Sequence, residues 1–225
     1  LRVLTAGGDA VRHVPAQRWF APDAAPPAAA HGAFVPGAQL FDGAFFGVSA
    51  AEASAMDPQQ RLLLETGYAA LHAVRERRET LDGADVGVFL GIMNADFAAL
   101  RADDESVYAA TGGTISIAAG RMSYALGTQG PCASYDTACS SALVALHAAS
   151  SAVAAASCEA ALTLGVSLML APRTHARYAT AGMLAADGRC KTFDAAANGY
   201  ARGEGVGAIA LGERLAAERC VAPRG

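Results

Sequence analysis

The sequence contains few charged side chains, and the positive ones form no long basic run. Charged residues make up 17% of the 225 residues, and the formal net charge is −4. The one short basic cluster, RERR at residues 75–78, is typical of the last turn of a helix, where arginine complements the helix dipole. A nucleic-acid-binding surface is therefore not expected.

Cysteine is sparse, and its spacing excludes the common zinc and redox motifs. The five cysteines are Cys132, Cys139, Cys158, Cys190 and Cys220. None of them forms a C-x-x-C pair, and no cysteine or histidine pattern has the spacing of metal ligands. Scattered thiols in odd number indicate reduced cysteines in a reducing compartment. We therefore expect a cytoplasmic protein that binds no metal itself.

The sequence also lacks a long apolar run and an N-terminal targeting signal. Its longest apolar stretches are interrupted by glycine, serine or charged residues before they reach membrane-spanning length. The first residues, LRVLTAGGDAVRHV, include no initiator methionine and no charged region followed by an apolar one. Hydrophobic residues nevertheless make up 53% of the chain, which is ample for a core. We expect a soluble protein, or a piece of one, without contact to a membrane.

Helical and strand patterns alternate along the chain, with no internal repeat and no convincing linker. The pattern predicts an irregular loop at 21–33, helices at 56–78, 115–127 and after residue 139, and strands at 84–92, 132–136, 159–170 and 206–212. The strands are continuously apolar, as in sheets that helices cover on both faces. The sequence therefore predicts an α/β fold, with residues 1–225 in one domain.

Cys139 stands where a polar cluster meets a long run of small apolar residues, in YDTACSSALVALHAASSAVA at 135–154. Asp136 and Thr137 are good helix caps, so Cys139 is expected in or beside the first turn of a helix. Free N–H groups and the positive end of the dipole stabilise a thiolate there and could hold an oxyanion. Because the helix is apolar nearly all round, it is expected to be buried and to hold the thiol rigidly.

The residues by themselves leave the role of Cys139 open between a buried apolar side chain and a nucleophile. A nucleophilic cysteine needs a base, and His147 lies about 12 Å further along the same helix, which is too far. The RGEGVG stretch at 202–207 precedes a strand, so we interpret it as a turn and not as a dinucleotide loop. Glu204 and the neighbouring Arg202 are interpreted as a structural ion pair.

Four separate stretches carry a resemblance to a known family. They are FFGVSAAEASAMDPQQRLLLE (45–65), AAGRMSYALGTQGP (118–131), GPCASYDTACSSALVALHAA (130–149) and AGMLAADGRCKTFDAAANGYARGEGVGAIAL (181–211). Together they resemble a β-ketoacyl synthase, and most closely the ketosynthase domain of type I polyketide synthases. The MDPQQRLLLE and DTACSS blocks are highly specific, and the order and spacing fit the family across essentially the whole chain.

The resemblance implies a thiolase-like fold, layered α/β/α, with two similar halves that are each built around a five-stranded sheet. The chain would be the N-terminal half of such a domain, without its first strand. Cys139 would be the catalytic nucleophile that takes an acyl chain as a thioester, with its backbone N–H as an oxyanion donor. A malonyl-type unit on acyl carrier protein would then undergo decarboxylative condensation with that thioester.

The resemblance also implies the partners of the chain. Substrates would arrive on the phosphopantetheine arm of acyl carrier protein, and no cofactor would be bound by the chain itself. The chain would belong to a multidomain synthase in polyketide or fatty acid synthesis, and would form a homodimer with its interface near the CASYD segment (132–136). Neither nucleic acid nor a membrane is expected as a partner.

The chain departs from the family in several places. The family's two catalytic histidines and its catalytic lysine have no matching position, so the chain alone is expected not to condense substrates. Tyr135, Cys132, Ser167 and Asn198 replace residues that are usual in the family; the first two flank the nucleophile segment and bear on substrate range. Cys158 and Cys220 are expected to behave as ordinary thiols. The alternative is a truncated, non-catalytic protein that only folds, dimerises or binds carrier protein.

Overall fold

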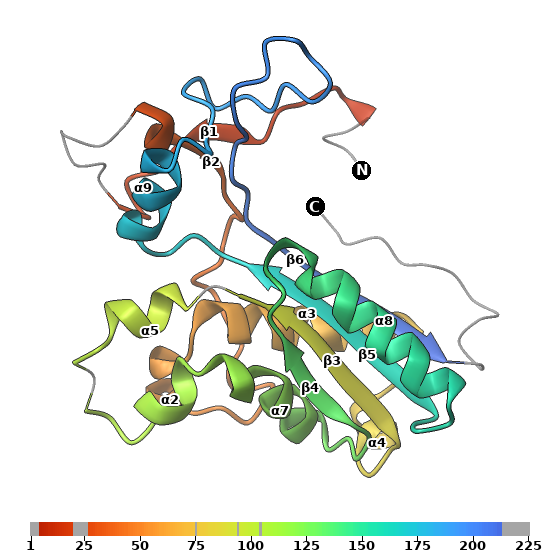
Figure 1. Cartoon of the computed structure of the whole chain (residues 1–225). Coiled ribbons are helices and arrows are strands. Elements are labelled where there is room, and N and C mark those ends of the chain that lie inside the picture. The colour runs from red at the N-terminus through yellow and green to blue at the C-terminus, as the bar shows by residue number, and fades with distance from the viewer. Residues whose placement is uncertain (1–4, 20–26, 75, 94, 104, 213–225) are drawn as a thin grey trace. The chain divides into compact units, whose positions relative to one another are not determined.

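The computed structural model describes residues 5–19, 27–74, 76–93, 95–103 and 105–212 (Figure 1). Contacts between residues divide the chain into two compact units. The larger unit contains Gly37–Ser167 and, among the described residues, 206–212; the smaller contains the described residues up to Pro36 and the segment Leu168–Gly205. In the described residues, no helix is long and apolar enough to cross a bilayer.

A four-stranded sheet in the order β4-β3-β5-β6 forms the centre of the larger unit. Its strands are β3 (Val86–Ile92), β4 (Cys132–Tyr135), β5 (Ala160–Ser167) and β6 (Gly205–Gly212). The central strand β3 pairs in parallel with both β4 and β5. These three strands therefore end at the same edge of the sheet, the edge at which α/β proteins bind ligands. All four strands were predicted from the sequence, with boundaries within a few residues.

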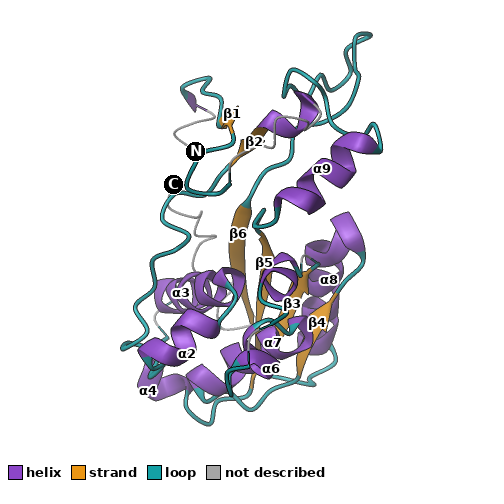
Figure 2. Cartoon of the chain, turned by 90° about the vertical axis from the view of Figure 1, so that its left-hand side faces the viewer, coloured by secondary structure: helices purple, strands orange, loops and turns teal. Residues whose placement is uncertain are grey.

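Helices cover both faces of this sheet, as the continuous apolar strands predicted (Figure 2). On one face, α3 (Pro58–Ala73) and α7 (Ile115–Leu126) enclose the main apolar core, which includes Leu63, Leu64, Met122, Val88, Leu90, Leu162 and Leu164. On the other face, α8 (Ser141–Ala154) packs through small residues, Ala145 and Ala149, against Phe89 and Ala161. The unit is therefore a three-layer α/β/α sandwich.

Helix α3 begins where the sequence predicted and ends earlier. Asp57 caps it by accepting a hydrogen bond from the N–H of Gln59, and Pro58 occupies its first turn. The helix ends at Ala73, so the RERR cluster does not lie in its last turn, and that prediction is wrong. Arg78 instead begins a separate short helix, α4 (Arg78–Leu81), while Arg75 lies outside the described residues.

Several short elements were not predicted from the sequence. They are α2 (Ala50–Ala55), α5 (Asp96–Leu100), α6 (Ala109–Gly112), the strands β1 (Val11–His13) and β2 (His31–Ala33), the 3-10 turn η1 (Pro27–Ala30), and α9 (Pro172–Thr180). Because η1 and β2 occupy 27–33, the irregular loop predicted at 21–33 is wrong for that part, and 21–26 lie outside the described residues. Such short elements carry little periodicity, so tertiary packing decides them.

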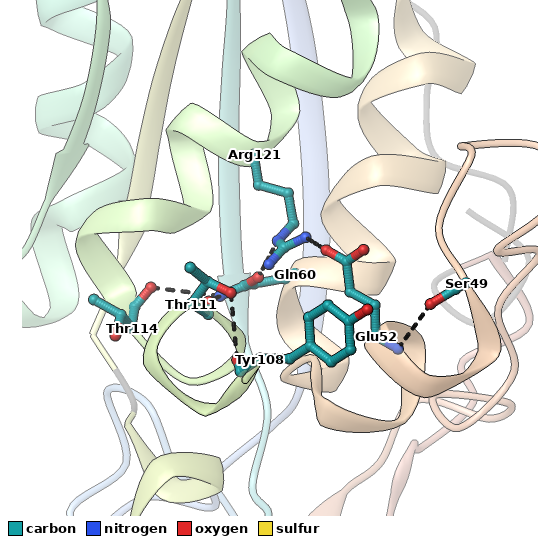
Figure 3. Close-up of polar contacts among 7 residues, drawn as sticks. All are labelled: Ser49, Glu52, Gln60, Tyr108, Thr111, Thr114 and Arg121. Atoms are coloured by element: carbon teal, nitrogen blue, oxygen red, sulfur yellow. Dashed lines mark hydrogen bonds and ion pairs between the residues drawn. The ribbon is translucent and has the colours of Figure 1, made fainter. Parts of the chain in front are cut away.

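The MDPQQ block contributes a buried polar network that joins α2, α3 and α7 (Figure 3). Gln60, only 3% exposed, donates to the carbonyl oxygens of Thr111 at 3.2 Å and Thr114 at 3.4 Å. It accepts a hydrogen bond of 2.7 Å from Nε of Arg121, whose guanidinium also pairs with Glu52. A glutamine at this position satisfies two carbonyl groups and an arginine at once, so the block fixes the packing of the helices.

Asp57 is buried at the start of α3, where it is 3% exposed. Its carboxylate accepts hydrogen bonds from the backbone N–H and the side-chain amide of Gln59, at 2.8 and 3.1 Å. Burial raises the pKa of Asp57 from its ordinary value of 3.8 to about 6, and the charge of Asp96 adds to this; the bonds from Gln59 and the charge of Arg61 oppose it. The folded chain therefore holds this proton more tightly than the unfolded chain.

Asp57→Asn should change how stability depends on pH. The raised pKa of Asp57 favours folding below about pH 4, and this contribution is lost as the pH rises through about 6. Because asparagine also caps helices but carries no charge, the variant should gain about 2–3 kcal/mol of unfolding free energy relative to the unchanged chain over that range. Urea unfolding at several pH values measures this. Asp103→Asn, at an exposed position, is the control and should show no such gain; a pH-independent difference for Asp57→Asn would contradict the explanation.

The smaller unit contains an antiparallel ribbon and one helix. Strands β1 and β2 pair with His13 opposite His31, and α9 packs on η1 around a small core of Ala28, Ala29, Ala179 and Leu184. The single tryptophan, Trp19, lies edge-on to the ring of Phe34 and at a tilt to the ring of His175, at centroid distances of 6.1 and 5.8 Å. These ring contacts add to the small core of the unit.

The side chain of Glu204 forms hydrogen bonds with three segments of the smaller unit. Its side chain is fully buried and accepts hydrogen bonds from Arg18 at 2.7 Å, from the N–H of Val35 at 2.8 Å and from the N–H of Met169 at 2.9 Å. The structure shows an ion pair of Glu204 with Arg18, a residue that the local pattern did not indicate, in place of the pairing with Arg202 on which the prediction was based. A buried carboxylate with three donors is well compensated, so it holds these segments in a defined arrangement.

Candidate active site

Cys139 lies in a tight turn at the carboxyl edge of the sheet. Strand β4 ends at Tyr135, and the 3-10 turn η2 (Ala138–Ser140) leads directly into α8, which begins at Ser141. The predicted position beside the first turn of a helix is therefore correct. Strands β4 and β5 lie on either side of β3, so helix α8, which connects them, crosses β3 (Figure 1). The turn before α8 therefore lies at the edge where the three strands end.

The residue before the cysteine has a strained backbone. Ala138 has a φ angle of 57°, in the left-handed region that costs a residue with a Cβ atom about 1–2 kcal/mol. Such strain persists only where the surroundings enforce it, and it concentrates at functional sites. The sharp turn exposes Cys139 at the surface of the described chain, in place of extending the strand.

Polar side chains within the turn enforce this conformation. Oδ1 of Asp136 accepts a hydrogen bond of 3.0 Å from the N–H of Ala138. The hydroxyl of Ser141 accepts from the N–H of Thr137 at 2.9 Å and donates to the carbonyl oxygen of Ala138 at 2.6 Å. Asp136 thus caps the turn as the sequence indicated, whereas Thr137 uses its hydroxyl to contact that of Ser140. These bonds hold the backbone on both sides of Cys139.

Two glycines let the start of α8 approach the sheet. A Cβ atom on Gly91 of β3 would lie 2.4 Å from the N atom and 2.6 Å from Cα of Ala142. A Cβ atom on Gly165 of β5 would lie 2.8 Å from the Cβ of the same alanine. The two glycines are directly opposite in the sheet register. The backbone of α8 therefore rests on the backbone of the sheet, and this contact fixes the height of Cys139 above the strands.

Helix α8 is buried on one side only, which differs from the prediction of a helix enclosed all round. Ala145 and Ala149 are fully buried against the sheet, while Leu143 is 68% exposed and His147 is also exposed. Leu143 and His147 are four residues apart within α8, so they share the open face. The apolar composition led to an overestimate of the burial of α8, because small alanine side chains occur on a packed face and on an open one alike.

Cys139 lies in the turn that leads into α8, and backbone N–H groups and the dipole at such a helix start favour a negative charge. The first N–H groups of a helix have no acceptor within the helix, and Cys139 stands two residues before Ser141, where α8 begins. The positive end of the dipole of the 14-residue helix α8 lies at this turn. The turn therefore combines a thiol, an N–H donor and a helix end, which is the equipment for nucleophilic attack on a carbonyl group.

The other thiols lack this combination. Cys158 is 3% exposed, and burial raises the pKa of its thiol, so the expectation of ordinary behaviour is wrong for this residue. Cys132 lies on the edge strand β4 and is exposed. The thiol of Cys190 accepts a hydrogen bond of 3.2 Å from the N–H of Ala201 but does not stand at a helix end. Cys220 lies outside the described residues.

Two departures from the family pattern have structural explanations. Tyr135 is partly buried and packs against the cluster of Phe89, Ala145 and Ala149, which α8 forms with the sheet. The side-chain oxygen of Asn198 accepts a hydrogen bond of 2.8 Å from Lys191, which also pairs with Asp187. A neutral amide at position 198 therefore still serves the lysine as an acceptor. The local sequence pattern gave no indication of either contact.

A layered α/β unit that presents a cysteine on a strained strand-to-helix turn has the architecture of thiolase-like enzymes. The chain belongs to the β-ketoacyl synthase family, whose N-terminal domain model matches residues 1–217. It is 46% identical over 217 residues to the spectinabilin polyketide synthase system protein NorA' of Streptomyces orinoci. It is 42% identical over 219 residues to erythronolide synthase EryA3 of Saccharopolyspora erythraea.

Solved structures agree with this assignment. The chain is similar to the ketosynthase from module 6 of the bacillaene synthase of Bacillus subtilis 168, with a TM-score of 0.83 and 37% identity over 94% of this chain and 35% of that one. It is also similar to the oxazolomycin ketosynthase domain OzmH KS7 of Streptomyces albus JA3453, with a TM-score of 0.86 and 34% identity, over 96% of this chain and 40% of that one. The chain spans 6% and 7% of the two synthases named above.

Proposed function

We propose that this chain supplies the acyl-accepting part of a ketosynthase, with Cys139 as the nucleophile. The observation that carries the proposal is the strained turn at Ala138, which exposes the thiol at the N-terminus of α8. Thiolate attack on the carbonyl carbon of an acyl thioester forms a C–S bond and an oxyanion, to which the N–H of Cys139 donates. The C–S bond to the carrier arm then breaks, and the released thiolate takes up the proton that Cys139 lost.

The similarity to polyketide synthases supports a proposal for the substrates and partners of the chain. The acyl chain would arrive on the phosphopantetheine arm of an acyl carrier protein within a multidomain synthase. A malonyl-type unit would then lose carbon dioxide, and its carbanion would attack the thioester on Cys139. On this proposal the chain binds no cofactor itself, because the carrier protein brings the reactive thioester.

Strand β4 supports the proposal of a homodimer through residues 132–136. In the described residues, β4 is the edge of the sheet and has β3 as its one neighbour. An edge strand presents unpaired N–H and C=O groups that a second strand can bind. Pairing of two copies at β4 would place the interface directly beside the turn that carries Cys139.

Incubation of the chain with an acyl-phosphopantetheine thioester tests the proposed function. We expect mass spectrometry to find the acyl adduct on Cys139, and Cys139→Ala to abolish it. Cys158 should remain unmodified because it is buried. Malonyl carrier protein should yield no β-ketoacyl product with the chain alone, because the family's catalytic histidines and lysine have no matching positions here.

The exposed thiol of Cys190 is the internal control in this experiment. Equal acylation of Cys139 and Cys190 would show that the turn confers no reactivity and would favour the non-catalytic alternative. A β-ketoacyl product from the chain alone would contradict the proposal that condensation requires residues that this chain does not contain. The intact cysteine on a strained turn favours the catalytic reading over a protein that only folds, dimerises or binds carrier protein.

A further inference from the structure

His13 and His31 meet at the end of the ribbon formed by β1 and β2. The antiparallel register places them directly opposite each other, and their ring centroids lie 4.4 Å apart with the ring planes tilted by 38°. Directly opposed residues on an antiparallel pair have Cβ atoms about 4.5–5.5 Å apart, which suits contact between two imidazoles. Strand pairing alone creates this arrangement, because the two histidines are far apart in the sequence.

One nitrogen of this pair has no partner in the described part of the chain. Nδ1 of His31 is buried and makes no hydrogen bond there. The backbone at Gly188 packs closely on the same side chain, since a Cβ atom there would lie 2.6 Å from Cβ and 2.7 Å from Cγ of His31. A buried polar atom without a partner costs about 1–3 kcal/mol. A ligand that bonds to this nitrogen would remove that cost.

We propose that His13 and His31 form a two-imidazole binding site for a divalent late first-row transition-metal ion, such as Zn²⁺ or Ni²⁺. Neutral imidazole nitrogens suit these ions. Zinc–nitrogen bonds of about 2.0–2.1 Å allow two nitrogens on one ion to be at most about 4 Å apart. The ring centroids lie 4.4 Å apart, so rotation of the side chains that turns one nitrogen of each ring toward the other can place both nitrogens on one ion.

The surroundings of the pair permit a cation. Arg189, next to Gly188, forms an ion pair with Asp9, so these two charges offset each other. In the described residues, no group of three or more histidine, cysteine, aspartate or glutamate side chains gathers that could hold an ion. The proposed ion therefore has two protein ligands, and water completes its coordination. Such an ion would cross-link β1 to β2 and close the loop between them. A link that closes a loop stabilises the folded state, so the ion would stabilise the ribbon.

Calorimetric titration of the untagged chain with ZnCl₂ tests the site. We expect one Zn²⁺ per chain, and a melting temperature that rises with Zn²⁺ concentration, because a ligand that binds only the folded state stabilises it. Loss of a second-shell residue already lowers metal affinity by about 10–100-fold, so His13→Asn and His31→Asn should each lower it by at least about tenfold. Mg²⁺ prefers oxygen ligands and should not bind.

Two further variants separate metal binding from folding. His13→Phe keeps a ring against His31 but removes the metal ligand, so it should fold and melt like the unchanged chain without added Zn²⁺. His147→Asn removes an exposed histidine on α8 and should leave Zn²⁺ affinity unchanged. The proposal is overturned if Zn²⁺ affinity survives in His13→Asn and His31→Asn, or if His147→Asn lowers it equally.

Discussion

Gly91→Ala should destabilise the larger unit strongly and reduce the reactivity of Cys139. The added Cβ atom would lie 2.4 Å from N of Ala142 and 2.5 Å from the carbonyl carbon of Ser141, both of which are backbone atoms that cannot rotate away. Helix α8 must then move off the sheet, and we expect a loss of about 3 kcal/mol or more in unfolding free energy, at or beyond the upper end of overpacking effects. Urea unfolding followed by circular dichroism measures the loss.

Gly120→Ala is the matched control for this substitution. Gly120 lies within α7, where an added Cβ atom meets nothing within 4 Å. The same chemical change should therefore stabilise the chain by about 0.5–1 kcal/mol, because alanine favours helix over glycine. In the Gly91→Ala variant, acylation or alkylation of Cys139 should also slow, since the turn is carried by α8. Unchanged stability and labelling in that variant would refute the close contact between α8 and β3.

Glu204→Gln should destabilise the smaller unit by about 3–5 kcal/mol, the range for breaking a buried ion pair. Both carboxylate oxygens of Glu204 accept hydrogen bonds, one from Arg18 and Val35 and the other from Met169. Glutamine has almost the same shape, but its amide N–H₂ must then face an N–H donor, and the charge of Arg18 loses its partner. The fluorescence of Trp19, the single tryptophan, reports on this unit during denaturation.

Two comparisons isolate the buried charge as the cause. Glu79→Gln makes the same change at an exposed position in α4 and should leave the Trp19 transition unchanged. A double-mutant cycle with Arg18→Met measures the coupling directly, and we expect Glu204→Gln to cost much less when Arg18 is already absent. Equal losses in both backgrounds would mean that Glu204 acts through its backbone N–H partners and not through the ion pair.

The long elements of the larger unit could be predicted because their local signals agree with their packing. Asp57 and Pro58 mark the start of α3, and Gly127, with a φ angle of 75°, ends α7 as its position after Leu126 predicted. The continuous apolar strands predicted helices on both faces, and α3, α7 and α8 occupy those faces. The end of α3 was misjudged because RERR fits a helix terminus as well as it fits the start of α4.

The sequence by itself determined the family and the positions of the main strands along the chain, and it indicated Cys139 as the candidate nucleophile. Specific motifs such as MDPQQRLLLE and DTACSS carry that information locally, and Cys139 is intact within one of them. Its place beside a helix start followed from capping residues that lie within a few positions of it. Each of these inferences depended on neighbours in the chain, so no knowledge of distant contacts was needed.

Only the tertiary structure decided which distant groups meet. The left-handed turn at Ala138 and the contact of Gly91 with α8 depend on how closely the helix packs on the sheet. The partner of Glu204 lies far away in the sequence, and His13 reaches His31 only because β1 and β2 pair in one register. The spacing of residues in the sequence shows only which residues are neighbours along the chain. The environment of a buried charge, or the meeting of two imidazoles, depends on distances in space, and these are set by folding.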